Sequence, residues 1–287
     1  MTNEIEFKKL FLIIANKKKL IIFITLIFTV MSFVYSLVLP NIYSSFALLM
    51  PSEKKDSPLF NMGNYSTIAG IAGVDIANSD TAKSVEAIKR IESYEFFSKL
   101  FVPNIDFKDL VAPKKWDSKT KTLSYKEHVL DSESQKISIQ EAYVIYRDML
   151  TITEDKKSSF VTIRISHPSP EISKAWVDLI VSKINSSMQS SDRKAIEKSM
   201  KFLEEESKST NIQSIRESIS NILESEMQKL MLLTANDEYV FKIIDPPIVP
   251  EKKSEPKRLI IIVIGIFSGI FVSVTISLLT HKEESIN

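Results

Sequence analysis

Two long apolar stretches, residues 20–39 and 259–280, lie near opposite ends of a 287-residue chain that is otherwise mostly polar. About 20 helical residues, at roughly 1.5 Å per residue, cross the roughly 30 Å hydrocarbon core of a bilayer. The pattern therefore predicts two transmembrane helices and one large domain held at the membrane by both ends. A secretory signal peptide for the first stretch, and buried helices of a soluble protein for both, are the alternatives.

Between the two stretches, alternating and β-branched segments predict four short strands, at residues 43–50, 149–153, 160–166 and 239–244. The polar sequence EDKKSS between the middle two predicts an antiparallel hairpin. Helical spacing predicts covering helices at residues 80–100 and 138–147, and the second opens with the capping-box pair Ser138 and Glu141. Residues 103–136 show little periodicity and are predicted to be loop. The expected fold class is therefore α+β, with a small mixed sheet as its base.

The strongest helical signal begins at Ser169 and Pro170, a capping residue followed by proline at the first helical position. Apolar residues then recur at helical spacing and predict a helix over about residues 170–209, and a second stripe follows over residues 215–231. These predict a long helical hairpin that projects from the sheet, away from the membrane. Residues 185–194 are polar apart from Met188, so part of this helix is expected to bridge solvent or pair with another subunit. A core hairpin of a monomer and a contact surface between subunits both remain open.

The charges that flank the two stretches give conflicting orientations. The basic residues before the first stretch place the N-terminus in the cytoplasm by the positive-inside rule, and they are Lys8, Lys9, Lys17, Lys18 and Lys19. The residues before the second stretch argue the opposite, and they are Lys252, Lys253, Lys257 and Arg258. We assign the orientation from the first stretch, because the first helix usually dominates the orientation of the chain and long loops translocate largely regardless of charge. Residues 1–19 and 281–287 are then cytoplasmic, and residues 40–258 form the domain outside the cytoplasm.

Composition excludes several classes of site. The chain has no cysteine and a net charge of +1, which excludes disulfides and thiolate zinc sites and disfavours nucleic-acid binding. The three histidines, each predicted to be solvated or to cap a helix, lie far apart without a metal-ligand partner at helical spacing. No glycine cluster forms a phosphate-binding loop, and the glycines of MGNYSTIAGIAG predict a turn-rich stretch instead. No catalytic, metal-binding or cofactor-binding residue is nominated, so the sequence predicts no enzyme. The histidines are His128, His167 and His281, and the glycines of that stretch are Gly63, Gly70 and Gly73.

Two further patterns surround the start of the second stretch. Prolines forbid helix and favour a stiff, extended connector before it, and they are Pro246, Pro247, Pro250 and Pro256. Within the stretch, Gly265 and Gly269 are four residues apart, and Ser273 continues the spacing. Such a small-residue face allows the backbones of two membrane helices to approach closely. We therefore expect these three positions to pack against another helix.

Together these features resemble the Wzz-type chain-length determinants, the polysaccharide co-polymerases of bacterial inner membranes. The resemblance is carried by the basic N-terminus, the strand YSSFALLM, the helix start SHPSPEISKAWVDLIVSKIN, the segment EYVFKIIDPPIVPEKKSEPKR, and the face of Gly265 and Gly269. It implies a periplasmic α/β base near the membrane, a long helix extending from it, and a ring-like homo-oligomer. Ser273 departs from the family, whose glycine pattern continues at this position.

The resemblance also implies a function without catalysis or cofactors. The chain would be an inner-membrane regulator of O-antigen length, with a Wzy-type polymerase and a lipid-linked glycan as partners. Because seven residues follow the second stretch, we expect no fused tyrosine autokinase, which favours the O-antigen branch over capsule. An adaptor of a capsule or exopolysaccharide export apparatus is the main alternative. A two-span sensor is a weaker one, because the cytoplasmic segments leave no room for an output domain.

Overall fold

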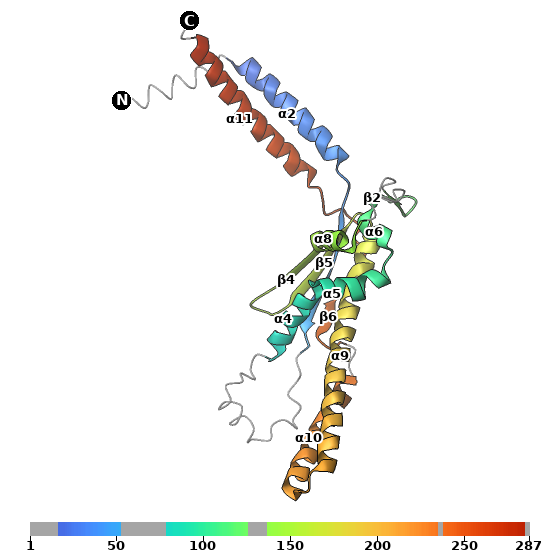
Figure 1. The fold of residues 1–287 in the computed structure, drawn as a ribbon. Coiled ribbons are helices and arrows are strands. Elements are labelled where there is room, and N and C mark those ends of the chain that lie inside the picture. Colours follow the sequence, from blue (N-terminus) through green and yellow to red (C-terminus); the bar gives the residue numbers. More distant parts are fainter. Residues whose placement is uncertain (1–16, 53–78, 126–136, 235–237, 285–287) are drawn as a thin grey trace, which may run out of the picture. The chain divides into compact units, whose positions relative to one another are not determined.

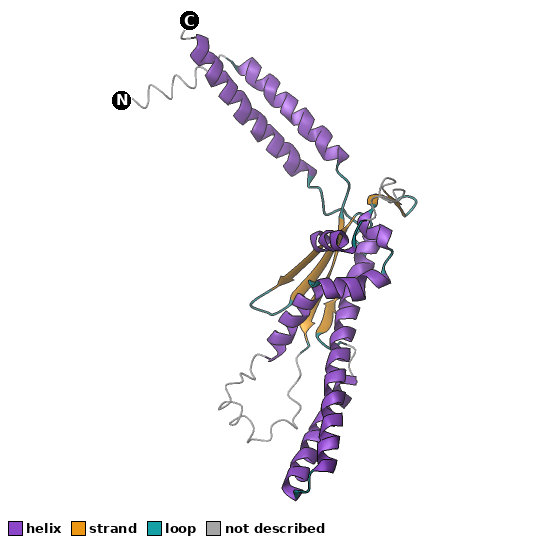
Figure 2. Cartoon of the chain, in the orientation of Figure 1, coloured by secondary structure: helices purple, strands orange, loops and turns teal. Residues whose placement is uncertain are grey.

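A computed structural model of the chain describes residues 17–52, 79–125, 137–234 and 238–284 (Figures 1 and 2). The chain forms two compact units, one from Met1–Ile42 with Lys252–Asn287 and one from Tyr43–Glu251. Several residues singled out above lie outside the described ranges, namely Lys8, Lys9, Gly63, Gly70, Gly73 and His128.

The smaller unit contains two apolar helices, α2 (Lys18–Val38) and α11 (Arg258–Glu284). Both are long and apolar enough to cross a membrane, with mean hydropathies of 2.5 and 2.8. Helix α2 ends at Val38 because Leu39 is extended and Pro40 follows, and proline disfavours helical backbone in the residue before it. Large side chains such as Phe33 and Phe271 are 50% and 75% exposed in the isolated chain. Such exposure suits helices that lipid covers.

The larger unit is built on a four-stranded sheet in the order β4-β5-β1-β6. Its strands are β1 (Tyr43–Pro51), β4 (Leu150–Glu154), β5 (Val161–His167) and β6 (Phe241–Asp245). The prediction of an α+β fold is confirmed, but the prediction of a mixed sheet is wrong, because every neighbouring pair is antiparallel. The physical reason is strand order. Strands β5 and β6 run in the same direction, but β1 lies between them and runs opposite to both, so no parallel pair is formed.

One face of this sheet packs against helices α4 (Ser79–Ile91), α8 (Ile139–Met149) and the first half of α9 (Pro170–Ser209). Ile163 and Ile165 of β5 and Leu49 of β1 are fully buried on it. Burial of each such side chain contributes roughly 1.5–3 kcal/mol. Aromatic side chains fill the space between the helices, with ring centroids 4.8–5.3 Å apart, and they are Phe97, Phe101, Tyr146 and Trp176.

The segment between α4 and α8 is more structured than predicted. The expected helix over residues 80–100 is interrupted after Ile91, because Ser93 caps a new start by accepting a hydrogen bond from the Phe96 nitrogen (3.2 Å). The expected loop over residues 103–136 also contains regular structure in its described part. The elements of this segment are α5 (Tyr94–Phe96), η3 (Phe97–Phe101), η4 (Val102–Asn104), α6 (Phe107–Val111), β2 (Pro113–Asp117) and β3 (Thr122–Tyr125).

The long helix α9 is followed by α10 (Gln213–Thr234), and the two form a helical hairpin (Figure 1). Ser169 caps α9, since its Oγ accepts a hydrogen bond from the Ile172 nitrogen (3.4 Å). The buried side chains of α9 end at Met188, so the second half of the helix extends beyond the core of the sheet. The projecting hairpin predicted from the sequence is therefore present.

Candidate functional site

The two apolar helices pack closely at the small residues of α11. A Cβ atom at Gly265 would lie 2.1 Å from the Oγ and 2.4 Å from the Cβ of Ser32 on α2, and one at Gly269 would lie 2.9 Å from the Cβ of Phe28. Carbon atoms in contact are normally about 3.5–4.0 Å apart, so glycine is required at both positions. Ser273, the third residue of the face, is fully buried, and its Oγ donates a hydrogen bond to the Ile270 carbonyl (2.9 Å).

A hydrogen bond joins the helices beside this contact, from the Ser32 Oγ to the Ile261 carbonyl (3.0 Å). Interhelical bonds of this kind are worth about 0.6 kcal/mol on average in a membrane. The structure thus gives Gly265 and Gly269 a partner helix within the same chain.

The proline segment is extended, as its sequence predicts, and hydrogen bonds hold it at both ends. In the larger unit, the Ser45 Oγ of β1 donates to the Ile248 carbonyl (2.7 Å). In the smaller unit, the Ile42 nitrogen donates to the Glu255 carbonyl (3.0 Å), and the Ser254 nitrogen donates to the Ile42 carbonyl (2.8 Å). Of the four prolines, Pro247 is buried, Pro250 and Pro256 are half-buried, and Pro246 is exposed. These bonds tie the segment after β6 to the chain that enters β1.

The polar middle of α9 has a role that the sequence interpretation missed. Asn185 is 5% exposed, and its Oδ1 accepts hydrogen bonds from the nitrogens of Val240 (2.8 Å) and Phe241 (2.9 Å), while its Nδ2 donates to the Phe241 carbonyl (3.0 Å). Gln189 donates to the Leu233 carbonyl (2.7 Å). The expectation that this stretch bridges solvent or pairs with another subunit is wrong for these residues, because they bind the returning chain of the same protein.

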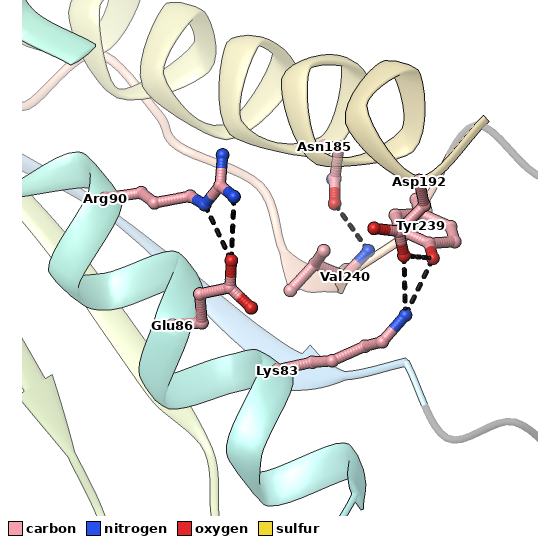
Figure 3. A network of polar contacts seen from close by, with 7 residues as sticks. All are labelled: Lys83, Glu86, Arg90, Asn185, Asp192, Tyr239 and Val240. Atoms are coloured by element: carbon pink, nitrogen blue, oxygen red, sulfur yellow. Dashed lines mark hydrogen bonds and ion pairs between the residues drawn. The ribbon is translucent and has the colours of Figure 1, made fainter. Parts of the chain in front are cut away.

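A second polar contact joins α4 to the same region (Figure 3). The Lys83 Nζ donates to the Asp192 carboxylate and to the Tyr239 hydroxyl, both at 2.8 Å, and the Tyr239 hydroxyl donates to Asp192. Burial alone would lower the pKa of Lys83, but the hydrogen bonds to Asp192 and Tyr239 raise it on balance. The signal in the sequence was the spacing of Asn185, Gln189 and Asp192, which places them on one face of a helix. We call Lys83, Asn185, Gln189, Asp192 and Tyr239 the polar clasp.

His167 is buried, so the expectation of a solvated histidine is wrong here, although it does lie just before the α9 cap. Its Nδ1 accepts a hydrogen bond from the Ser169 nitrogen, and its Nε2 lies 2.9 Å from the Asp109 carbonyl. Because one nitrogen accepts and the other faces an acceptor, the neutral ring satisfies both contacts. Burial lowers the pKa of His167, which keeps the ring neutral near pH 7.

Helix α10 leaves a row of apolar side chains exposed. Only Ile219 and Leu233 are buried among its residues, whereas Met231 is 64% and Leu232 is 57% exposed. A shallow groove between α10 and the second half of α9 has a mixed lining of apolar and polar side chains, and they are Met200, Leu223, Met227 and Met231 with Glu204, Glu224 and Gln228. Contiguous exposed apolar surface is typical of interaction sites in proteins.

Within the described ranges, no three His, Cys, Asp or Glu side chains come together as metal ligands. The geometry described above consists of packing contacts: a close helix pair, a proline segment held by hydrogen bonds, the polar clasp and an exposed apolar helix face.

Comparison with known families finds a match for the first third of the chain. Residues 3–101 match the Wzz family, described as chain length determinant protein. By this match, residues 3–101 are similar to the Wzz family. The resemblance drawn from the sequence is thus confirmed, and the Wzz region contains α2, β1 and α4. No curated protein matches the chain significantly.

Solved structures of similar arrangement include a full-length bacterial polysaccharide co-polymerase, 12% identical, with a TM-score of 0.41 over 96% of this chain and 98% of that chain. A fragment of the polysaccharide co-polymerase WzzB from Salmonella Typhimurium is 11% identical, with a TM-score of 0.33 over 75% of this chain and 100% of that chain. A mutant of the Shigella flexneri lipopolysaccharide O-antigen chain-length regulator is 11% identical, with a TM-score of 0.23 over 75% and 100%.

Proposed function

We propose that this protein regulates the length of a polysaccharide, the O-antigen of lipopolysaccharide, without catalysing its synthesis. The observation that carries the proposal is the match of residues 3–101 to the chain length determinant family. The architecture agrees with it, since two apolar helices flank one domain whose described contacts are structural. The protein would act as a scaffold that influences how long a polymerase continues to extend one chain.

The scaffold would be held in the bacterial inner membrane by α2 and α11, with both termini in the cytoplasm and the main domain in the periplasm. The length and hydropathy of both helices support this location. The basic residues outside the second span conflict with the positive-inside rule, but two of them have local polar partners. Lys253 and Arg258 both donate to the Asn41 side chain, at 3.3 and 3.2 Å. These bonds give Lys253 and Arg258 a structural role that does not depend on the positive-inside rule.

The scaffold would be a homo-oligomer, a ring of copies whose contact surface includes α10. The exposed apolar residues of α10 would pack against the hairpin of a second copy, and they are Ile215, Ile222, Met227, Met231 and Leu232. Burying a Leu, Ile or Met side chain contributes roughly 1.5–3 kcal/mol, so a few such residues in each copy can hold neighbouring hairpins together. The methionines can adapt to an irregular partner surface because their side chains are unbranched and flexible.

The partners would be a Wzy-type polymerase in the same membrane and the lipid-linked glycan that it extends. The exposed faces of α2 and α11 offer surface for a membrane partner, because their small-residue face is already occupied within the chain.

The proposal is tested by deleting the gene and separating the lipopolysaccharide on a gel, followed by complementation with the wild-type gene. We expect deletion to abolish the preferred chain length and complementation to restore it. A ladder that is unchanged by deletion would contradict the proposal. If the ladder is unchanged but surface capsule is lost, the adaptor of a capsule or exopolysaccharide export apparatus replaces it. The variant Met227→Glu, Met231→Glu tests separately whether α10 contributes to the contact between copies. The matched control is Lys198→Glu, Lys201→Glu, on the exposed face of α9.

A further inference from the structure

The β2–β3 hairpin carries an unusual concentration of unpaired basic charge. Its four lysines are all exposed, and they are Lys114, Lys115, Lys119 and Lys121. Among the described residues, none of these four makes an ion pair. The lysines of the neighbouring helices differ, since Lys89, Lys99 and Lys174 each pair with an acidic residue one helical turn away.

In the part of the chain that the structure describes, the acidic groups near the hairpin are already engaged. Asp117 accepts a hydrogen bond from the Lys119 nitrogen (2.9 Å), which closes the turn. Asp106 pairs with Lys108, and Asp109 accepts a hydrogen bond from the Tyr125 hydroxyl (2.6 Å). The hairpin therefore presents positive charge that its own aspartates neutralise only in part.

An aromatic residue accompanies this charge. Trp116 of β2 pairs in register with Leu123 of β3, and both side chains are half-buried. Trp is typical of membrane–water interfaces, because its ring is apolar and its indole nitrogen is a hydrogen-bond donor. Lysine suits the same region, since its apolar stem can lie along the interface while the ammonium group reaches the phosphates.

The hairpin also lies at the end of the larger unit through which the chain enters from α2. Tyr43, the first residue of β1, pairs with His167, and His167 contacts the Asp109 carbonyl of α6. Helix α6 leads directly into β2, and Tyr125 at the end of β3 returns to Asp109. Only five residue steps separate Tyr43 from the last helical residue, Val38. Fully extended, five steps reach roughly 18 Å, so the chain itself limits how far this end can be from the end of α2.

We propose that the β2–β3 hairpin lies on the membrane surface and binds the phosphate groups of anionic phospholipids through these lysines, with Trp116 at the interface. The proposal rests on the membrane anchoring in the proposed function. Each Lys near an anionic membrane surface strengthens binding by roughly fivefold, and the attraction falls off within a Debye length. The hairpin would hold the base of the scaffold against the bilayer and limit its tilting about the connectors.

The experiment uses the full chain reconstituted in liposomes with a nitrobenzoxadiazole label on Ser118→Cys, in the turn of the hairpin. The chain has no native cysteine, so the label is unique. In bilayers containing phosphatidylglycerol we expect blue-shifted, brighter emission that brominated phosphatidylglycerol quenches, and we expect little of either in phosphatidylcholine alone. A label on Ser214→Cys in α10, at the far end of the hairpin α9–α10, should respond in neither bilayer.

The lysines are tested by changing all four to glutamine, with Lys194, Lys198, Lys201 and Lys208 of α9 changed to glutamine as the matched control. We expect the hairpin variant to weaken the Ser118→Cys response at least roughly tenfold, as should salt on the order of 1 M, while the control variant keeps it. Equal emission in the two wild-type bilayers would overturn the proposal, whatever the lysine variant does.

Two further outcomes separate the possible causes. Loss of the label response on addition of soluble pyrophosphate would replace the membrane surface by a site for a free phosphate ligand, and would overturn the proposal. Chains that fail to float with the liposomes would contradict the membrane anchoring itself, and with it both proposals. Chains that float without a label response would contradict the hairpin proposal alone.

Discussion

The close contact between α2 and α11 gives the sharpest prediction, because the geometry at Gly265 leaves no room for one methyl group. A Cβ at this position would lie 2.1 Å from the Ser32 Oγ and 2.4 Å from its Cβ. Gly265→Ala therefore has to displace Ser32 or move the two helices apart. The Ser32 side chain cannot easily rotate away, because its Oγ donates a hydrogen bond to the Ile261 carbonyl and its Cβ is attached to the helix backbone.

The expected cost is the sum of two effects. Forcing a methyl group into a packed contact costs about 1–3 kcal/mol, and weakening the interhelical hydrogen bond adds about 0.6 kcal/mol. The higher helix propensity of alanine offers little compensation, because an apolar helix stays helical in the bilayer even when it separates from its partner. We therefore expect Gly265→Ala to weaken the helix pair by roughly 2–4 kcal/mol.

The assay is a distance measurement between spin labels on Val38→Cys and Leu259→Cys, two highly exposed positions at the neighbouring ends of α2 and α11. Gly265→Ala should broaden the distance distribution and shift it to longer values in bicelles. Ser268→Leu, an enlargement on the exposed side of α11, is the matched control and should leave the distribution unchanged.

Ser32→Gly removes both atoms that clash, and the next atom, the Phe28 carbonyl oxygen, lies 3.4 Å from the new Cβ. The double variant Ser32→Gly, Gly265→Ala should therefore recover the distribution of Ser32→Gly alone. The reasoning would be refuted if the effects of Ser32→Gly and Gly265→Ala on the free energy of the helix pair add within about 0.5 kcal/mol. Additive effects would show that Ser32 and Gly265 are not in contact.

Two further predictions concern the larger unit. Asn185→Ala leaves the nitrogens of Val240 and Phe241 and the Phe241 carbonyl without this partner, so we expect a loss of roughly 3 kcal/mol or more in the free energy of unfolding. Denaturant unfolding in detergent measures it, and the exposed neighbour Ser186→Ala should cost less than about 0.5 kcal/mol. Burial lowers the pKa of His167 in the folded state below its value of 6.5, so the unfolded chain binds the proton more readily. Stability from this group should be complete above about pH 6.5 and should fall towards lower pH with a slope of at most about 1.4 kcal/mol per pH unit.

The predictions for Asn185 and His167 can each be refuted separately. If Asn185→Ala and Ser186→Ala unfold at the same denaturant concentration, the contacts of Asn185 with the returning chain do not contribute to stability. For the histidine, His167→Gln provides the comparison, since glutamine does not titrate. Wild-type and His167→Gln proteins with the same dependence of stability on pH would exclude His167 as the titrating group.

Features that depend on local pattern could be predicted from the order of the amino acids. The apolar stretches correspond to α2 and α11, and the capping Ser169 with Pro170 set the start of α9 at Pro170. These features were readable because helix length, capping and strand alternation depend on residues close together in the chain. The segment from Ile91 to Tyr125 was misread, since short elements such as α6 and β2 show too few periods to be recognised.

The contacts between residues far apart in the chain became visible in the folded structure. It showed that Asn185 binds the backbone near Val240 and that Lys83 reaches Asp192, whereas the sequence suggested only a polar stripe on a helix. It also gave Gly265 its partner, Ser32, although the four-residue spacing of glycines indicated only that some helix would lie close. Spacing along one element specifies which face is small or polar, but the partner of that face depends on how distant elements pack.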